Sequence, residues 1–145
     1  MKTLKIVFVE NAHDIDWNAL KAALRRDRFD NGRNARELRE SFQNSRHVCF
    51  AKIGDRIIGT GRLLSDNVCN AYLVDLWVST RFRRRGIASH IMALLLNAVP
   101  GQHVYLQTDD SRLYTKLGFQ FQPEGMSKVA GPWLRRRLPR DSRSA

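Results

Sequence analysis

The sequence predicts an α/β (α+β) fold with one mixed, mostly antiparallel sheet of six or seven strands and about four helices on its two faces. Three observations support this prediction. Segments with strand and helix periodicity follow one another in the order β-α-α-β-β-β-α-β-α-β(-β). Three consecutive strands predict a meander, and the helix after them predicts a right-handed β-α-β crossover. The length of 145 residues, with 43% hydrophobic and 27% charged residues, is typical of one globular domain.

Alternating apolar and polar side chains, with Val, Ile, Phe and Tyr enriched, identify the strands. Gly54–Asp55 separates two of them as a hairpin turn. The segment Ala71–Ser79 is the most strand-like in the chain. The predicted strands cover residues 4–9, 47–53, 56–64, 71–79, 103–108 and 119–122, with 127–130 as an optional seventh.

Capping residues and apolar residues at helical spacing identify the helices. Asp14 or Asp16 begins the first helix, and Asn34 begins the second after a polar loop over residues 25–34. Pro100–Gly101 ends the third helix, which is the most apolar. The predicted helices extend from residue 14 or 16 to about 26, and over 35–44, 86–99 and 110–117.

Positive charge is concentrated in two short segments. The chain has 25 Lys and Arg against 14 Asp and Glu, a net charge of +11, and residues 81–85 and 135–145 each carry +4 of it. We therefore expect one domain over residues 1–134 and a basic, disordered tail over 135–145. The tail serves solubility or contacts nucleic acid or another anionic partner, and the sequence leaves both interpretations open.

The sequence indicates that the chain is not a membrane, secreted or metal-binding protein. No apolar run approaches the roughly 18 residues of a membrane span, and the first residues lack a signal-peptide pattern. Cys49 and Cys69 make neither a disulfide framework nor a metal-ligand cluster. We expect a cytoplasmic, reduced protein without a bound metal and without a membrane partner.

The turn at residues 83–88 has features that would bind a pyrophosphate. It precedes the most apolar helix, whose first backbone N–H groups have no acceptor within the helix. Gly86 and Ala88 let an anion approach the backbone, and Arg83, Arg84 and Arg85 add positive charge. The pattern is neither a Walker loop nor a dinucleotide fingerprint. On its own it fits an ordinary basic surface turn equally well.

Two motifs, at this turn and near residue 115, follow a known pattern. Arg83-x-x-Gly86-x-Ala88 has the form (Gln/Arg)-x-x-Gly-x-(Gly/Ala). Residues 76–82 before it have the form L-x-V-x-P-x-(Y/F), with Thr80 in place of the proline. Residues 113–119 have the form (F/L)-Y-x-K-x-G-F. Both motifs, and the order of elements over residues 4–122, resemble the GCN5-related N-acetyltransferases (GNAT).

The resemblance implies that acetyl-CoA binds at this turn as the acyl donor. Its pyrophosphate would lie on the N–H groups of residues 84–89. Its thioester would lie beside Leu76–Val78, where a bulge separates the fourth strand from the fifth and a free N–H polarises the carbonyl. The expected cofactor-binding residues are Leu76, Trp77, Val78, Arg83, Arg84, Arg85, Gly86, Ile87, Ala88, Ser89 and Asp110.

The resemblance also implies transfer of the acetyl group to a primary amine by direct attack in a ternary complex. Tyr114 matches the family's proton donor to the leaving thiolate, with ring packing as its alternative role. Asp75, a carboxylate inside an apolar strand, is expected to be a general base or an ion-pair partner. An acid from another loop and a water chain are the other candidates for the base. Strict alternation puts Asp75 and Trp77 on one face of the strand and Tyr72, Val74, Leu76 and Val78 on the other.

The expected acceptor is a small-molecule or peptide amine. The basic loop 25–36 would border it and favours an acceptor that carries a carboxylate or a phosphate. The competing interpretation is a non-catalytic basic module of the same fold that senses an acyl-CoA or binds nucleic acid. Nucleic acid is the weaker alternative because no aromatic residues are interleaved with a stripe of arginines. A homodimer is compatible with the sequence, which fixes no interface.

Overall fold

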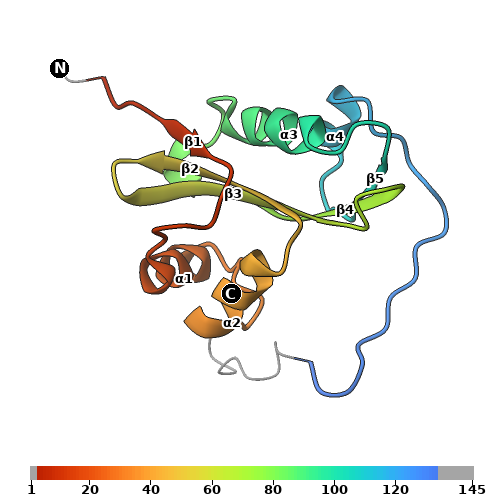
Figure 1. Cartoon of the computed structure of the whole chain (residues 1–145), viewed down its shortest axis with the longest axis horizontal. Helices are drawn as coiled ribbons and strands as arrows, with labels where there is room; N and C mark the ends of the chain where they lie inside the picture. The colour runs from red at the N-terminus through yellow and green to blue at the C-terminus, as the bar shows by residue number, and fades with distance from the viewer. Residues whose placement is uncertain (1–2, 134–145) are drawn as a thin grey trace.

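A five-stranded sheet lies between two pairs of helices (Figure 1). This computed structural model describes residues 3–133 of the chain. The strands follow one another across the sheet in chain order, antiparallel from β1 to β4 and parallel between β4 and β5. The strands are β1 (Val7–Val9), β2 (His47–Ile53), β3 (Arg56–Ser65), β4 (Asn70–Val78) and β5 (His103–Tyr105). The helices are α1 (Trp17–Arg26), α2 (Ala35–Gln43), α3 (Ile87–Asn97) and α4 (Arg112–Lys116), and a 3-10 turn, η1, covers Thr80–Phe82.

The first two helices begin where their capping residues predicted. The Asp16 carboxylate accepts a hydrogen bond from the Ala19 N–H and caps α1. Asn34 and Glu37 form a capping box at the start of α2. Both helices cover one face of the sheet, while α3 and α4 lie on the other (Figure 1). The prediction of helices on both faces is therefore confirmed.

The prediction of six or seven strands is wrong for the described residues, which form five. Residues 119–122 and 127–130 form no strand, and the chain after α4 runs as an extended segment away from β5 (Figure 1). Pro123 and Pro132 have no N–H to donate to a neighbouring strand. β1 and β5 are also shorter than predicted. Alternation of side chains identifies a segment that can form a strand, but pairing needs an aligned neighbour.

Each face of the sheet has its own hydrophobic core. On one face α3 buries Ile87, Ile91 and Leu95. On the other face α1 and α2 bury Leu20, Leu24, Leu38 and Phe42. Gly61 of β3 lies directly under α3, because a Cβ there would be 2.8 Å from Ile91 Cγ2 and 2.9 Å from Leu95 Cδ1. The missing side chain lets the helix pack close to the strand.

A bulge in β4 changes which face its side chains reach. Thr60 pairs with Trp77 and Arg62 with Val74, so two β4 residues, Asp75 and Leu76, lie opposite the single residue between them on β3. Within the bulge, Asp75 has a left-handed backbone conformation with a φ of +54°. Before the bulge, Leu73 belongs to the core under α3; after it, Trp77 belongs to the core under α1 and α2.

The bulge corrects the prediction of strict alternation along this strand. Alternation places Tyr72 and Leu76 on one face, opposite Leu73. In the structure Leu76 packs with Leu73 and Val78 against the α3 core, so the shared face predicted for Tyr72 and Leu76 is wrong. The extra residue shifts the period by one, which inverts the faces from there on.

The structure bears only in part on two predictions, the absence of a membrane span and the domain boundary at residue 134. No helix within residues 3–133 has both the length and the hydropathy needed to cross a membrane. The predicted basic tail, residues 135–145, lies outside the described residues. The domain boundary at residue 134 therefore remains a prediction.

Replacement of Gly61 by alanine should lower the free energy of unfolding by about 2 kcal/mol, because the new methyl group overlaps Ile91 and Leu95. Urea unfolding followed by circular dichroism measures this. Gly125→Ala is the matched control, since its Cβ would meet only the flexible Gln107 amide, at 3.5 Å. Equal stability of the two variants would show that α3 does not pack on β3 as described.

Candidate functional site

The N-terminus of α3 differs from those of α1 and α2, because it has no side-chain cap among the described residues. The first backbone hydrogen bond of α3 runs from the His90 N–H to the Gly86 carbonyl. The N–H groups of Ile87, Ala88 and Ser89 therefore have no acceptor within the helix. Together with the helix dipole they form a site for a negatively charged group.

Gly86 leaves the space in front of these N–H groups open. Its φ is +76°, in the left-handed region, and a Cβ built there meets nothing within 4 Å. Arg84, two residues earlier, also has a positive φ of +63°. The two residues turn the chain sharply into the helix, and a diphosphate would fit the concave backbone that results.

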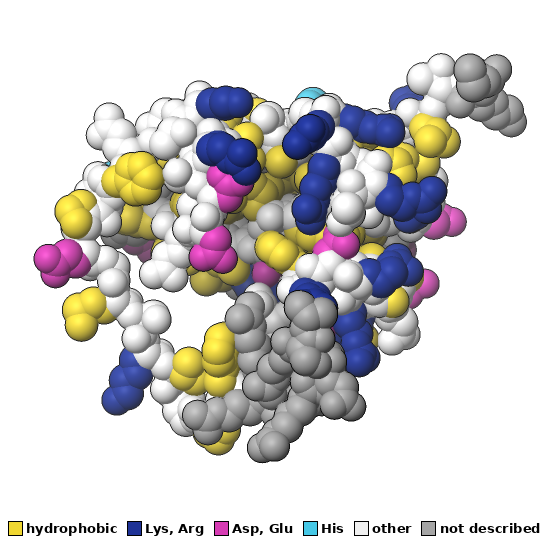
Figure 2. All heavy atoms as spheres, turned by 180° about the vertical axis from the view of Figure 1, so that it is seen from behind, with side chains coloured by type: hydrophobic (Ala, Val, Ile, Leu, Met, Phe, Trp, Pro, Cys, Tyr) yellow, Lys and Arg dark blue, Asp and Glu magenta, His cyan; other side chains and the backbone are white. Residues whose placement is uncertain are grey.

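Three arginines, Arg83, Arg84 and Arg85, directly precede this N-terminus, and two of them have local contacts. The Arg83 Nε donates a hydrogen bond to the Val78 carbonyl at 3.1 Å. The Arg85 guanidinium lies 5.4 Å from the centre of the Phe82 ring. In the view from behind, many Lys and Arg side chains lie on the side of the sheet that carries α3 and α4 (Figure 2). This surface is suited to an anionic ligand.

Thr80, which stands in place of the motif's proline, connects this turn to the end of α1. Its Oγ donates to the Asp27 carboxylate at 2.8 Å, and the Trp77 Nε1 donates to the same group at 2.8 Å. Burial raises the pKa of Asp27, but the hydrogen bonds from Thr80 and Trp77 and the charge of Arg83 outweigh it and leave the pKa below its ordinary value. Asp27 therefore stays ionised and holds the turn against α1.

β4 and β5 separate next to the bulge. Their pairing covers only three residues and ends where Tyr72 meets Tyr105. From Leu73 to Val78, β4 has no strand partner on its β5 side within residues 3–133. The backbone beside Leu76, Trp77 and Val78 can therefore form hydrogen bonds with an extended ligand.

Asp75 lies in a buried ion cluster. Its Oδ2 accepts from Arg33 Nη1 at 2.8 Å and from Arg62 Nε at 2.7 Å, and its Oδ1 accepts from Arg33 Nη2 at 3.1 Å. The side chains of Asp75, Arg33 and Arg62 are only 2%, 7% and 11% exposed. The hydroxyls of Ser41 and Ser45 and the backbone carbonyl of Asp30 accept the other bonds from the guanidinium groups.

This geometry supports the ion-pair role for Asp75 rather than the role of general base. A base must have an oxygen available to take a proton from the substrate, whereas both oxygens of Asp75 accept bonds from guanidinium groups. The sequence analysis missed Arg33 and Arg62. Arg62 carries the same signal as Asp75, a charge inside an apolar strand, and such a charge needs a partner when it is buried.

Tyr114 lies on α4 beside a cavity of about 860 Å³ between β5 and the chain that follows α4. Its ring contacts Phe119 edge-on, with 5.9 Å between the centroids. Burial and then the charge of Asp110 raise the pKa of the phenol above its ordinary value. The phenol therefore remains protonated through the neutral range, as a proton donor must.

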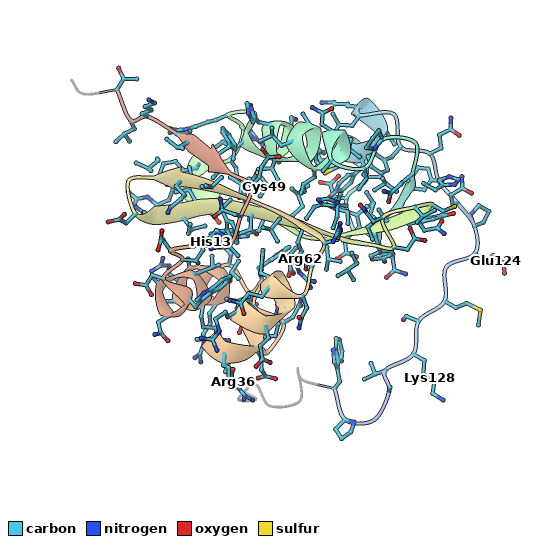
Figure 3. The ribbon with its side chains drawn as sticks, viewed as in Figure 1. His13, Arg36, Cys49, Arg62, Glu124 and Lys128 are labelled. Carbon is cyan, nitrogen blue, oxygen red and sulfur yellow. The ribbon has the colours of Figure 1, made fainter. Side chains whose placement is uncertain are left out.

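Asp110 and His13 occupy exposed positions. Hydrogen bonds from Arg112 hold the pKa of Asp110 at about 2, which ties this predicted cofactor residue to its neighbour. His13 lies after β1 at a separate cavity of about 340 Å³ (Figure 3). Cys49 is buried and Cys69 is exposed, and both are free thiols. Burial raises the pKa of the Cys49 thiol to about 12. No group of His, Cys, Asp and Glu within the described residues could hold a metal ion.

Comparison with known proteins points to one family. The model of the acetyltransferase (GNAT) family matches residues 10–119. A GNAT family acetyltransferase of Streptococcus pneumoniae superposes with a TM-score of 0.73 at 20% identity, over 88% of this chain and 100% of that one. A predicted acetyltransferase of Clostridium acetobutylicum, solved with acetyl-CoA, gives 0.64 at 20% identity, over 86% and 96%.

A third similar structure belongs to an enzyme whose name gives its substrate. Glucosamine-6-phosphate N-acetyltransferase of Arabidopsis thaliana gives a TM-score of 0.67 at 16% identity, over 86% of this chain and 98% of that one. These likenesses at low identity establish the fold. No protein of curated function matches the chain.

Replacement of Asp75 by asparagine should lower the free energy of unfolding by about 3 kcal/mol, because it leaves two largely buried guanidinium groups without a counter-charge. Urea unfolding again measures the change. Asp110→Asn, which removes an exposed partner of Arg112, is the control and should leave the unfolding midpoint nearly unchanged. An Asp75→Asn variant of normal stability that has lost only activity would instead support the base role.

Proposed function

Because the chain belongs to the GNAT acetyltransferase family, we propose that it transfers an acetyl group from acetyl-CoA to a primary amine, by direct attack of the amine in a ternary complex. One observation carries the proposal. The longest helix has no side-chain cap, follows three arginines, and begins at a left-handed glycine with open space in front of it. This arrangement fits the diphosphate of coenzyme A.

The residues that would hold acetyl-CoA follow the chain from β4 into α3. The N–H groups of Ile87, Ala88 and Ser89 would bind the diphosphate, with Arg83, Arg84 and Arg85 close to it. The unpaired edge of β4 at Leu76–Val78 would hold the pantetheine arm, as a strand is held by its neighbour. Asp110 remains a predicted contact of the cofactor, although Arg112 already occupies its carboxylate.

Acetyl-CoA would supply the acetyl group as a thioester, whose carbonyl needs a hydrogen-bond donor and whose sulfur leaves as a thiolate. A backbone N–H next to the β4 bulge would polarise the carbonyl, as an oxyanion hole does. The Tyr114 phenol would hold the proton for the sulfur. Since Asp75 is engaged with Arg33 and Arg62, the amine would lose its proton to a water chain or enter as the neutral form.

The neighbouring structures give this proposal its context. One of them was solved with acetyl-CoA, and another acetylates the amine of a sugar phosphate according to its name. We propose a small-molecule or peptide amine as the acceptor here. A cytoplasmic location, a homodimer and the absence of nucleic acid as a partner stay predictions from the sequence.

Replacement of Gly86 by glutamate should abolish acetyl-CoA binding, because a negatively charged side chain would occupy the space in front of the helix N-terminus. Titration calorimetry with acetyl-CoA measures the loss. Gly101→Glu is a matched control: Gly101 also has φ of +76° and open space around its Cβ, but it follows the other end of α3. Equal affinity of the wild type and the Gly86 variant for acetyl-CoA would refute this binding site. If the wild type binds acetyl-CoA but transfers its acetyl group to no amine, the alternative of an acyl-CoA sensor is favoured.

Replacement of Tyr114 by phenylalanine should lower kcat about 100-fold and leave the affinity for acetyl-CoA almost unchanged, because it removes only a proton donor. Thiol release under saturating acetyl-CoA measures kcat. Because burial raises the pKa of the phenol, the fall in rate caused by its ionisation should begin at a higher pH than for a tyrosine of ordinary pKa. An unchanged kcat would assign the ring a packing role.

A further inference from the structure

The ion cluster around Asp75 contains more positive than negative charge. Two guanidinium groups, Arg33 and Arg62, share a single carboxylate, and their other partners are neutral hydroxyls and a backbone carbonyl. Asp30 next to them is already paired with Lys21. Within the described residues the cluster therefore has one positive charge without a counter-ion. Such a charge in a largely buried place favours the binding of an anion.

Arg62 is the more exposed of the two arginines in the cluster. Its side chain is 11% exposed, against 7% for Arg33, and it lies on the side of the sheet that faces α2 (Figure 3). Its Nε and Nη1 are bonded to Asp75 and Ser45. A guanidinium has five N–H donors, so others remain for a ligand.

Next to Arg62 the sheet carries partly exposed apolar side chains. Leu64, Tyr72 and Tyr105 share the face of Arg62, because Leu64 is two residues further along β3, Tyr72 pairs with Leu64, and Tyr105 pairs with Tyr72. These three side chains, which we call the open strip, are 43%, 36% and 40% exposed. Helices α1 and α2 cover the remainder of this face. The open strip offers an apolar surface to a molecule whose anionic end is at Arg62.

Arg62 lies next to the β4 bulge, where the proposed acetyl transfer would take place. Arg62 pairs with Val74, and the bulge residues Asp75 and Leu76 follow directly on the neighbouring strand. Adjacent strands are about 4.8 Å apart, so the guanidinium and the proposed site of the thioester belong to the same part of the sheet. The diphosphate site at α3 lies toward the other face. An acceptor would therefore approach from the face of Arg62.

We propose that the acceptor is an amine that also carries an anionic group, a carboxylate or a phosphate, and that Arg62 binds this group. The anion supplies the counter-charge that the cluster lacks, and the open strip contacts the apolar part of the molecule. The amine then lies at the β4 bulge. The proposal rests on acetyl transfer as the proposed function, and its test separates the two.

The first experiment compares amines that carry an anionic group with neutral partners that lack it. β-Alanine is paired with β-alaninamide, and 2-aminoethyl phosphate with ethanolamine, at equal concentrations of neutral amine. The anionic member of at least one pair should have a kcat/KM about 10- to 100-fold higher, the value of one charge-assisted hydrogen bond. The pair that shows the preference identifies carboxylate or phosphate. Equal or better use of the neutral amines overturns the proposal, while acetyl transfer itself stands.

The second experiment uses variants at the cluster. Arg62→Gln keeps the balanced Arg33–Asp75 pair and is expected to fold, and Arg62→Lys keeps the charge. Arg39→Gln, at an exposed position of α2, is the matched control. The Arg62→Gln variant should lose the preference for anionic amines because its KM for these acceptors rises, while its KM for acetyl-CoA stays unchanged. The Arg62→Lys variant should retain part of the preference. An unchanged preference in Arg62→Gln overturns the proposal.

A third measurement does not depend on turnover. At constant ionic strength and in the presence of acetyl-CoA, propionate or inorganic phosphate should raise the melting temperature of the wild type and of Arg39→Gln, but propionamide should not. Arg62→Gln should show no rise. A rise in every variant, or in none, overturns the anion site. Failure of acetyl-CoA to bind in calorimetry, by contrast, would overturn the proposed function.

Discussion

The bulge in β4 is the constraint on which the site depends. The ladder to β3 continues on both sides of it, so Asp75 and Leu76 share one position and Asp75 takes a left-handed conformation. A non-glycine residue in this region costs free energy and persists only where its surroundings hold it. Here the carboxylate of Asp75 is held by Arg33 and Arg62, and the Thr60 hydroxyl donates to its carbonyl at 2.8 Å. The ion cluster therefore maintains the irregularity that the proposed chemistry needs.

The two proposed binding regions lie on opposite faces of the sheet, and the bulge lies between them. On the α3 side, the uncapped helix and the arginine turn suit a diphosphate. On the α2 side, the guanidinium pair and the open strip suit an anionic amine. Because the strand changes face at Asp75, its backbone lies between the two, where a thioester and an amine would meet. The ion cluster thus gives the charged residue inside the otherwise apolar segment Leu73–Val78 a structural role.

Local signals in the sequence predicted much of the fold. Asp16 and Asn34 begin the first two helices because a side-chain oxygen next to an apolar period satisfies free N–H groups of the first turn. The strand 47–53 was predicted with the bounds that the structure has. Residues 119–122 and 127–130 were predicted as strands and form none, since their pairing depends on a neighbour that alternation cannot identify. Gly86 was predicted to leave the start of α3 open, and the structure agrees, since a Cβ there would meet nothing within 4 Å; its role in binding stays a prediction.

The sequence by itself determined the order of the elements from β1 to α4, the family and the position of the glycine turn before α3, because each rests on residues that are close together in the chain. Tertiary structure decided the partners of Asp75. Its partners Arg33 and Arg62 are 42 and 13 residues away, and only the docking of α2 on the β3–β4 ladder brings them together. It also decided which face each side chain reaches after the bulge, because one extra residue in β4 inverts the alternation. The bulge arises from the register between β3 and β4, which the sequence of neither strand gives alone.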